Sequence, residues 1–227
     1  MSQWVCAAFS FLILTCPVSA QNGENLDVRI FRGVNALQDP SANGFIEYLD
    51  YTSLPTFGAL PVGFVLVGAA AGDRAVLEAG LLSMTAQLTS LGLTVAFKEI
   101  VGRPRPFESL SNVRVKHQWS ATGFSFPSGH TSQAFAIATV LSFKFSKGSF
   151  IIPCFLWASA IGYGRIFLGL HYPSDVVGGA IIGIVSGVAA WSLRGEARKI
   201  AERAIAEQRV AEAGFPQAEI MKIQIPF

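Results

Sequence analysis

Charged residues are scarce in this chain of 227 residues. Asp, Glu, Lys and Arg make up 14% of it, against roughly 25% in soluble domains. Hydrophobic residues make up 51%, and the mean hydropathy is +0.45. The shortage of charge excludes an ordinary soluble domain and indicates a membrane protein.

Cysteine is almost absent, and metal-binding motifs are missing. Cys6 and Cys16 lie in an N-terminal apolar run and Cys154 lies in a long apolar stretch, so we expect no disulfide and a small packed thiol. The three histidines are far apart in sequence, and neither Cys-x-x-Cys nor His-Glu-x-x-His occurs. We therefore expect no metal ion and no cofactor.

Long hydrophobic runs are present instead. They cover residues 54–72, 75–97, 126–143, 149–169 and 175–193. Each approaches the roughly 20 residues that a membrane-spanning helix needs. Because lipid tolerates only helices and closed barrels, we predict an all-α polytopic membrane helix bundle with five spans. Its membrane-embedded domain covers 54–193.

The flanking segments have other patterns. Residues 1–20 form an apolar run that ends in the small-residue sequence Val-Ser-Ala, which predicts a signal peptide or a short retained sixth helix acting as an N-terminal anchor. Residues 21–53 carry apolar side chains at helical spacing, typical of an amphipathic helix and loop on the outer face. Residues 194–227 predict a cytoplasmic helical tail.

Basic residues have an uneven distribution along this topology. With residue 21 outside, the turns and the tail that carry most Lys and Arg are cytoplasmic, as the positive-inside rule requires. The outward segment 98–125 is an exception, because it contains Lys98, Arg103, Arg105, Arg114 and Lys116. An anionic ligand would explain this excess. Arg103, Arg114 and Lys116 are equally consistent with solvated loop charges or headgroup contacts.

Six ionisable residues fall at the outer ends of the spans: Lys98 and Arg105 after the second, His130 at the start of the third, Arg165 at the end of the fourth, and His171 and Asp175 at the start of the fifth. Each such group costs roughly 2.5 kcal/mol or more at the centre of a membrane helix. A bound phosphate would compensate, because its oxygens accept hydrogen bonds from guanidinium and ammonium groups.

The spacing of these residues suggests roles. His171 and Asp175 are four residues apart, so a helix would place the carboxylate where it orients the imidazole as a nucleophile. Pro173 suits a first helical turn, whose free amides favour an anion. In "PSGH", Gly129 allows the backbone to approach phosphate, and His130 is left to act as a general acid. A histidine and an aspartate at this spacing are more often a structural hydrogen bond. The glycines of "GGAIIGIVSG" (178–187) indicate close helix packing.

Three motifs resemble those of the type-2 phosphatidic acid phosphatase superfamily, integral-membrane branch: "KEIVGRPRP" (98–106), "PSGH" (127–130) and "RIFLGLHYPSD" (165–175). The third motif usually begins Ser-Arg, and Gly164 stands in place of that serine. The resemblance implies metal-independent dephosphorylation of a lipid phosphate or diphosphate through a phosphohistidine at the outer face. Candidate substrates are undecaprenyl diphosphate, phosphatidylglycerophosphate and lipid A phosphate.

The resemblance also implies a role for each matching residue. His171 is the nucleophile, Asp175 positions it, and His130 is the general acid. The phosphate is bound by Lys98, Arg105, Ser128, Gly129 and Arg165. We expect membrane lipids and a lipid phosphate as partners, no nucleic acid, and a bacterial inner membrane with the site facing the periplasm. The alternatives are a lipid phosphotransferase with the same phosphohistidine and a non-enzymatic transport protein.

Overall fold

The computed structural model describes residues 25–37, 40–115 and 123–212, and all regular structure in these ranges is helical. The predicted all-α fold is confirmed at this level. The predicted signal peptide, Lys116, His117 and the last part of the predicted tail, 213–227, lie outside the described residues. The helices are α2 (Leu26–Asn35), α3 (Pro40–Ala70), α4 (Arg74–Val101), α5 (Pro106–Ser109), α6 (Gly129–Lys144), α7 (Gly148–Phe167), α8 (Pro173–Ser192) and α9 (Arg194–Glu212).

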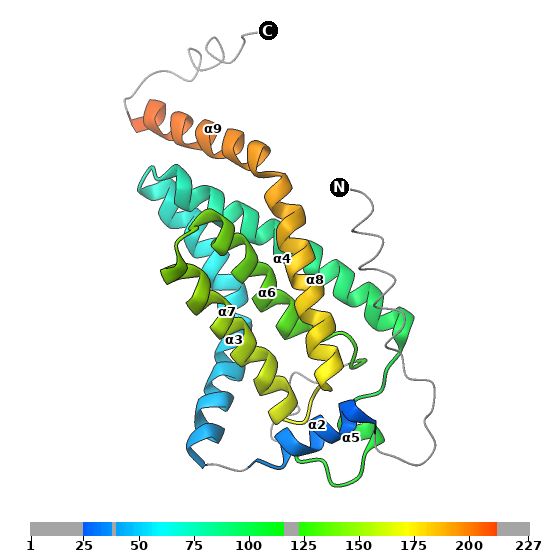
Figure 1. Ribbon diagram of the computed structural model, residues 1–227. Coiled ribbons are helices and arrows are strands. Elements are labelled where there is room, and N and C mark those ends of the chain that lie inside the picture. The colour runs from blue at the N-terminus through cyan, green and yellow to red at the C-terminus, as the bar shows by residue number, and fades with distance from the viewer. Residues whose placement is uncertain (1–24, 38–39, 116–122, 213–227) are drawn as a thin grey trace.

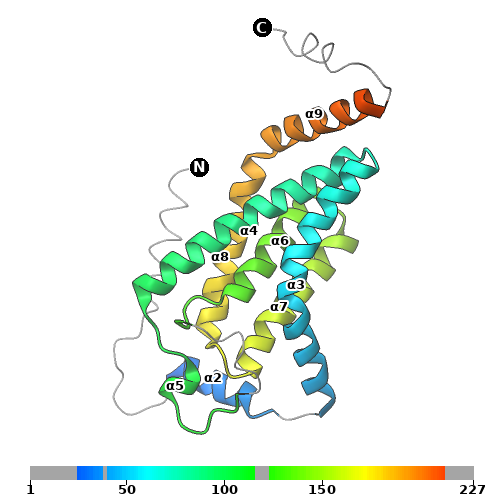
Figure 2. The ribbon, with the colours of Figure 1, turned by 180° about the vertical axis from the view of Figure 1, so that it is seen from behind.

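The long helices form an elongated bundle with a short helix layer at one end. Figure 1 shows α2 and α5 lying across the lower ends of α7 and α8, and α9 lying across the opposite end. The view from behind shows the same order (Figure 2). We refer to these as the α2 end and the α9 end.

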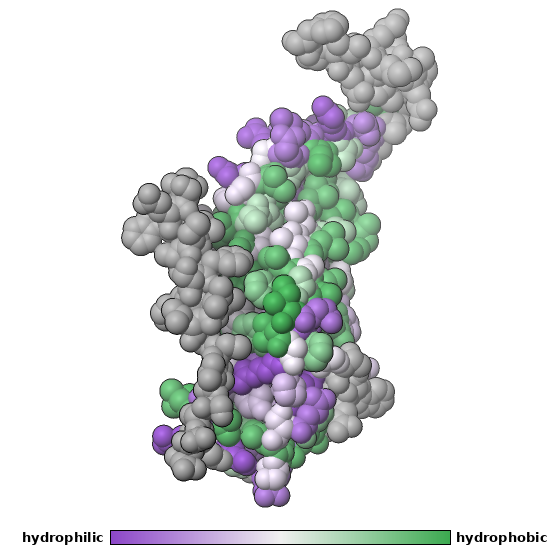
Figure 3. Space-filling model, turned by 90° about the vertical axis from the view of Figure 1, so that its right-hand side faces the viewer, coloured by the Kyte–Doolittle hydropathy of each residue, from purple (hydrophilic) through white to green (hydrophobic). Residues whose placement is uncertain are grey.

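Helices lie over all five predicted spans, although their lengths differ from the prediction. Within the described residues, α3, α4, α7 and α8 are long and apolar enough to cross a membrane. The third predicted span corresponds to α6, which has only 16 residues. The first lies inside a longer helix that already begins at Pro40. One face of the molecule is mainly hydrophobic between hydrophilic groups at the two ends (Figure 3), as expected for a bundle that crosses lipid.

Close packing of α6 against α8 forms the centre of the bundle. The buried side of α6 is rich in alanine, and α8 faces it with glycines. A Cβ atom on Gly179 would lie 2.5 Å from the Ser128 carbonyl oxygen, and one on Gly183 would lie 2.4 Å from the Ser132 carbonyl oxygen. The glycines therefore allow the two backbones to touch, which confirms the predicted small-residue packing. This contact fixes the start of α6 beside the start of α8.

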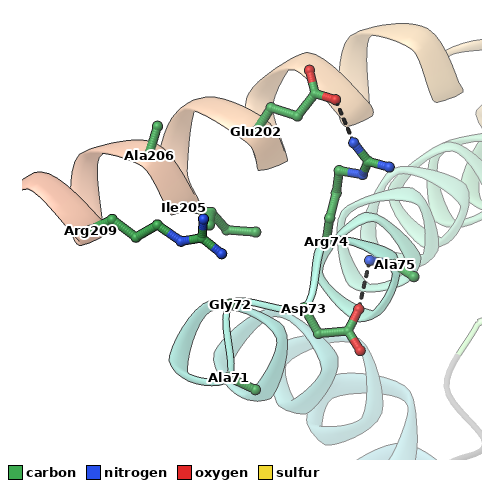
Figure 4. A pocket seen from close by; sticks show the side chains of 9 residues that line it. All are labelled: Ala71, Gly72, Asp73, Arg74, Ala75, Glu202, Ile205, Ala206 and Arg209. Carbon is green, nitrogen blue, oxygen red and sulfur yellow. Dashed lines mark hydrogen bonds and ion pairs between the residues drawn. The ribbon is translucent and has the colours of Figure 1, made fainter.

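Ion pairs join the helices at the α9 end. Lys144 of α6 pairs with Glu78 of α4, and Arg74 lies 2.7 Å from Glu202 of α9. A cavity of about 690 Å³ opens between the α3–α4 turn and α9 (Figure 4). Asp73 on its wall caps α4 by accepting a hydrogen bond from the Ala75 amide at 2.8 Å. These interactions use three of the four charged residues that line the cavity, Asp73, Arg74 and Glu202, and we assign this end a structural role.

The close contact between α6 and α8 leads to a prediction about the stability of the protein. Gly183→Ala should lower the free energy of unfolding by about 1–3 kcal/mol, because the new methyl group would overlap the α6 backbone. The matched control is Gly58→Ala on α3, where nothing lies within 4 Å of the added Cβ atom. The measurement is thermal unfolding in detergent. Equal melting temperatures for the two variants would show that α6 and α8 are not in tight contact.

Candidate active site

His171 lies in the short connection between α7 and α8. The amides of Leu170 and His171 donate to the Arg165 carbonyl oxygen at 3.0 and 3.2 Å, which closes the end of α7. Gly169 has φ +80°, and a Cβ atom there would lie 2.7 Å from the Arg114 carbonyl oxygen. Only glycine fits this turn without strain. The turn places the imidazole of His171 inside the α2 end, where its residue is 2% exposed.

Asp175 holds one side of this imidazole. Helix α8 begins at Pro173, so His171 precedes the helix and does not share a helical face with Asp175. The carboxylate reaches back instead: Oδ2 accepts a hydrogen bond from the Tyr172 amide at 2.8 Å and lies 3.5 Å from His171 Nδ1. Ser125 Oγ also donates to Oδ2. The predicted pair therefore forms through a helix cap rather than through helical spacing.

Arg105 lies on the other side of the imidazole. Its Nη1 atom is 3.5 Å from His171 Nε2. The guanidinium also donates to the carbonyl oxygens of Leu170 at 3.2 Å and Gly123 at 2.9 Å. These contacts fix a buried cation beside the ring nitrogen that would attack phosphorus.

Two further cations complete a positive cluster. Arg165 lies in the last turn of α7 and forms an ion pair with Asp50 of α3. Lys98 lies in the last turn of α4 and donates to the Phe124 carbonyl oxygen. Lys98 is within electrostatic range of both Arg105 and Arg165. Like charges gathered at membrane depth favour the binding of an anion between them.

The "PSGH" segment places the start of α6 beside the same cluster. Ser128 is the N-cap of α6, and its amide donates to the Asp175 carbonyl oxygen at 3.0 Å. Its hydroxyl is 2.8 Å from Thr131 Oγ1. A Cβ atom on Gly129 would meet only Thr94 Cγ2, at 3.6 Å. The first turn of α6 is thus an open helix N-terminus of the kind that binds anions.

His130 follows directly in the first turn of α6. Its Nε2 atom is buried and has no hydrogen-bond partner among the residues that the structure describes. Its ring contacts the ring of Phe57, with centroids 5.9 Å apart. The charges that act on it belong to Arg165, His171, Arg105 and Lys98. The structure therefore brings all eight predicted site residues to the α2 end, with His130 within electrostatic range of His171.

Sequence reasoning missed several partners of these residues. Arg103, interpreted as a loop charge or a headgroup contact, instead lies 2.7 Å from Asp175 Oδ1. Asp27 and Asp50 come from 21–53, a segment to which no chemistry was assigned. Neither Asp27 nor Asp50 lies in one of the three motifs. The position of Arg103 within "GRPRP", two residues before Arg105, was the one available signal.

Burial controls the proton affinity of His171. The pKa of His171 is lowered from 6.5 to about 4, mainly by burial, and the charges of Arg165 and Arg105 lower it further. The nearby carboxylate of Asp175 acts in the opposite direction. The imidazole is therefore neutral near pH 7, and a neutral nitrogen is what a nucleophile requires.

The helical bundle thus places three cations, Lys98, Arg105 and Arg165, around a histidine–aspartate pair, and the charge of this cluster is complementary to an anion. The model of the PAP2 superfamily matches residues 79–199, more than half of the chain. The protein therefore belongs to the PAP2 superfamily.

Named relatives agree with this assignment. The chain is 33% identical over 149 residues to lipid A 4'-phosphatase of Bacteroides thetaiotaomicron, covering 59% of this chain and 65% of that protein. It is 25% identical to undecaprenyl-diphosphatase BcrC of Bacillus subtilis, covering 71% and 81%. Thus the match spans just under two thirds of the length of the first relative.

Solved structures share the fold. The crystal structure of Aquifex aeolicus LpxE superposes with a TM-score of 0.64 at 29% identity, covering 77% of this chain and 99% of that one. A PAP2 type phosphatidylglycerolphosphate phosphatase from Bacillus subtilis gives a TM-score of 0.67 at 22% identity, covering 86% and 98%. The second likeness is one of fold alone.

The low pKa of His171 leads to a prediction about how the free energy of unfolding depends on pH. Unfolded His171 binds a proton below about pH 6.5, whereas the folded residue does so only near pH 4. Its contribution to stability is present above pH 6.5 and is lost as pH falls toward 4. Relative to His171→Gln, the wild type should lose about 3 kcal/mol between pH 7 and 4. Unfolding of both proteins in detergent at several pH values measures this. A constant difference would contradict the assigned pKa.

Proposed function

We propose that this protein is an integral-membrane phosphatase that removes a phosphate group from a lipid phosphate or diphosphate through a phosphohistidine. The observation that carries the proposal is the position of the His171 imidazole between Asp175 at 3.5 Å and Arg105 at 3.5 Å. A phosphoryl group bound beside His171 Nε2 would therefore also contact the guanidinium of Arg105. No other described cluster in the molecule combines a neutral nucleophile with several cations.

The first chemical step forms a nitrogen–phosphorus bond. The lone pair of His171 Nε2 attacks phosphorus, while Nδ1 keeps its proton and directs it at Asp175. Negative charge gathers on the three equatorial oxygens of the five-coordinate phosphorus. Arg105, Arg165 and Lys98 stabilise that charge together with the first amides of α6.

The first step also needs a proton donor, and the second step needs a base. As the nitrogen–phosphorus bond forms, the phosphorus–oxygen bond to the lipid breaks, and His130, protonated in the complex with the anionic phosphate, donates its proton to the leaving oxygen. The neutral His130 then accepts a proton from water, whose oxygen attacks the phosphohistidine and releases inorganic phosphate. His171 returns to its neutral form, so the cycle balances without a cofactor.

We propose a topology of five spans, in which α6 is the buried central one. The membrane-embedded phosphatase covers 54–193, residues 21–53 lie on the outer face, and 194–227 form a cytoplasmic tail. Basic residues of the α9 end support this orientation, since the helix carries Arg198, Lys199, Arg203 and Arg209. The site then faces the periplasm from a bacterial inner membrane, where its lipid substrates expose their phosphates.

Phosphate release tests the proposed function. Purified protein in detergent is given lipid A, undecaprenyl diphosphate or phosphatidylglycerophosphate, with and without EDTA. We expect phosphate release from at least one lipid and the same rate with EDTA. His171→Gln should lower kcat by at least about a thousandfold, because it removes the nucleophile. Arg198→Gln on exposed α9 is the control, and it should keep the wild-type rate.

Label transfer separates hydrolysis from the alternatives. Substrate labelled in its terminal phosphate should give an acid-labile labelled protein in the wild type and none in His171→Gln. Label that moved to a second lipid instead of to water would identify a phosphotransferase. A His171→Gln variant that still released phosphate would refute the nucleophile and the function that depends on it.

Vanadate gives a further prediction. It adopts the five-coordinate geometry of the transferring phosphorus, so a site complementary to that geometry should bind it more tightly than phosphate. We expect competitive inhibition that weakens about a hundredfold in Arg105→Gln, which removes the cation at His171. Inhibition constants from initial rates measure the effect. Unchanged inhibition in that variant would place the reacting phosphorus away from Arg105.

A further inference from the structure

Helix α2 contributes an acid to the site from outside the segment that the family model matches. The matched residues are 79–199, whereas α2 covers Leu26–Asn35 and lies across the ends of α7 and α8 (Figure 1). Asp27 in its first turn accepts a hydrogen bond from Arg103 Nη2 at 2.7 Å. It also accepts from the Ser174 amide at 2.9 Å and from the Ser174 hydroxyl at 2.6 Å.

Arg103 connects this acid to Asp175. Its Nη1 atom donates to Asp175 Oδ1 at 2.7 Å and to Ser174 Oγ at 2.6 Å. Its guanidinium carbon lies 3.9 Å from the centre of the Tyr172 ring. Two carboxylates and an aromatic face therefore hold one cation in place. The contacts form a continuous chain from Asp27 through Arg103 and Asp175 to His171.

The charges in this chain alternate, and that alternation matters for His171. Asp175 must keep its negative charge directed at the imidazole through Oδ2, yet its Oδ1 faces a full positive charge on Arg103. Asp27 offsets that positive charge from the far side. Without Asp27, Arg103 would draw Asp175 toward itself and add a net positive charge beside His171.

Other charged groups lie around the histidine–aspartate pair on the remaining elements. Arg165 from α7 and Arg105 before α5 act on His171 itself, in opposition to Asp175. Both arginines and Lys98 from α4 act on His130 of α6. The acids Glu108 from α5 and Asp50 from α3 act on Arg105 and Arg165. The negative charge that acts on His171 thus comes from Asp175, and these neighbours do not compensate for a change in its position.

We propose that Asp27 is a positioning residue for the phosphatase reaction: by holding and neutralising Arg103, it keeps Asp175 directed at His171. The inference rests on the proposed function and extends it to a helix that precedes the family segment. The N-terminal helix is thus part of the machinery that orients the nucleophile, and the segment 79–199 alone would lack it.

Asp27→Asn tests the inference, because it removes the charge with little change in shape. We expect kcat to fall about tenfold, which is the usual effect of removing a residue that orients a reacting side chain without touching the substrate. KM should change little. The acid limb of kcat/KM should move to lower pH, because His171 then has less negative charge near it. Asp27→Glu should restore most of kcat. Arg103→Gln combined with Asp27→Asn should be faster than Asp27→Asn alone, since no cation then draws Asp175 away from His171.

Asn35→Ala is the matched structural control. Asn35 also fastens α2, because its Nδ2 atom donates to the carbonyl oxygens of Arg114 at 2.9 Å and Phe167 at 3.0 Å, but it adds no charge. This variant should melt at a lower temperature with an unmoved acid limb. Wild-type kcat in Asp27→Asn, or a loss with an unmoved limb as in Asn35→Ala, would overturn the inference. Either result with an inactive His171→Gln would leave the proposed function intact.

Discussion

The gathering of Lys98, Arg105 and Arg165 at one end of a membrane bundle is the constraint on which the rest of the structure depends. Cations at membrane depth are unstable without anions or hydrogen-bond acceptors. The protein supplies them locally: the Phe124 carbonyl oxygen accepts from Lys98, the Leu170 carbonyl oxygen accepts from Arg105, and Asp50 pairs with Arg165. In the proposed function a phosphate group completes this arrangement, so that the same three side chains would supply both binding energy and catalytic stabilisation.

Packing in the middle of the bundle decides whether those side chains meet. The glycines of α8 bring its backbone against α6, and the Ser128 amide then bonds to the Asp175 carbonyl oxygen at 3.0 Å. This single contact joins the motif with the predicted acid to the motif with the predicted nucleophile. The acids of α2 and α3 act from outside these motifs and adjust the charge of the finished site.

Much of the site could be predicted from the sequence because its chemistry lies in short motifs. "KEIVGRPRP", "PSGH" and "RIFLGLHYPSD" contain all eight predicted positions, and the structure places them at the α2 end. The pairing of His171 with Asp175 was predicted for an incorrect reason, since α8 begins after His171 and a cap brings the two together. Arg103, Asp27 and Asp50 were missed because an ion pair between distant segments leaves no local pattern.

The sequence by itself determined the helical membrane class, the close packing of α8 and the set of side chains proposed to bind phosphate, because hydrophobic length, glycine spacing and motif order are local properties. Only the tertiary structure decided which acids balance which cations. Asp27 and Arg103 are 76 residues apart and Asp50 and Arg165 are 115 apart. Such pairs depend on how helices cross at one end of the bundle. The physical reason is that Coulomb interaction depends on distance in space, which hydropathy and spacing along the chain do not encode.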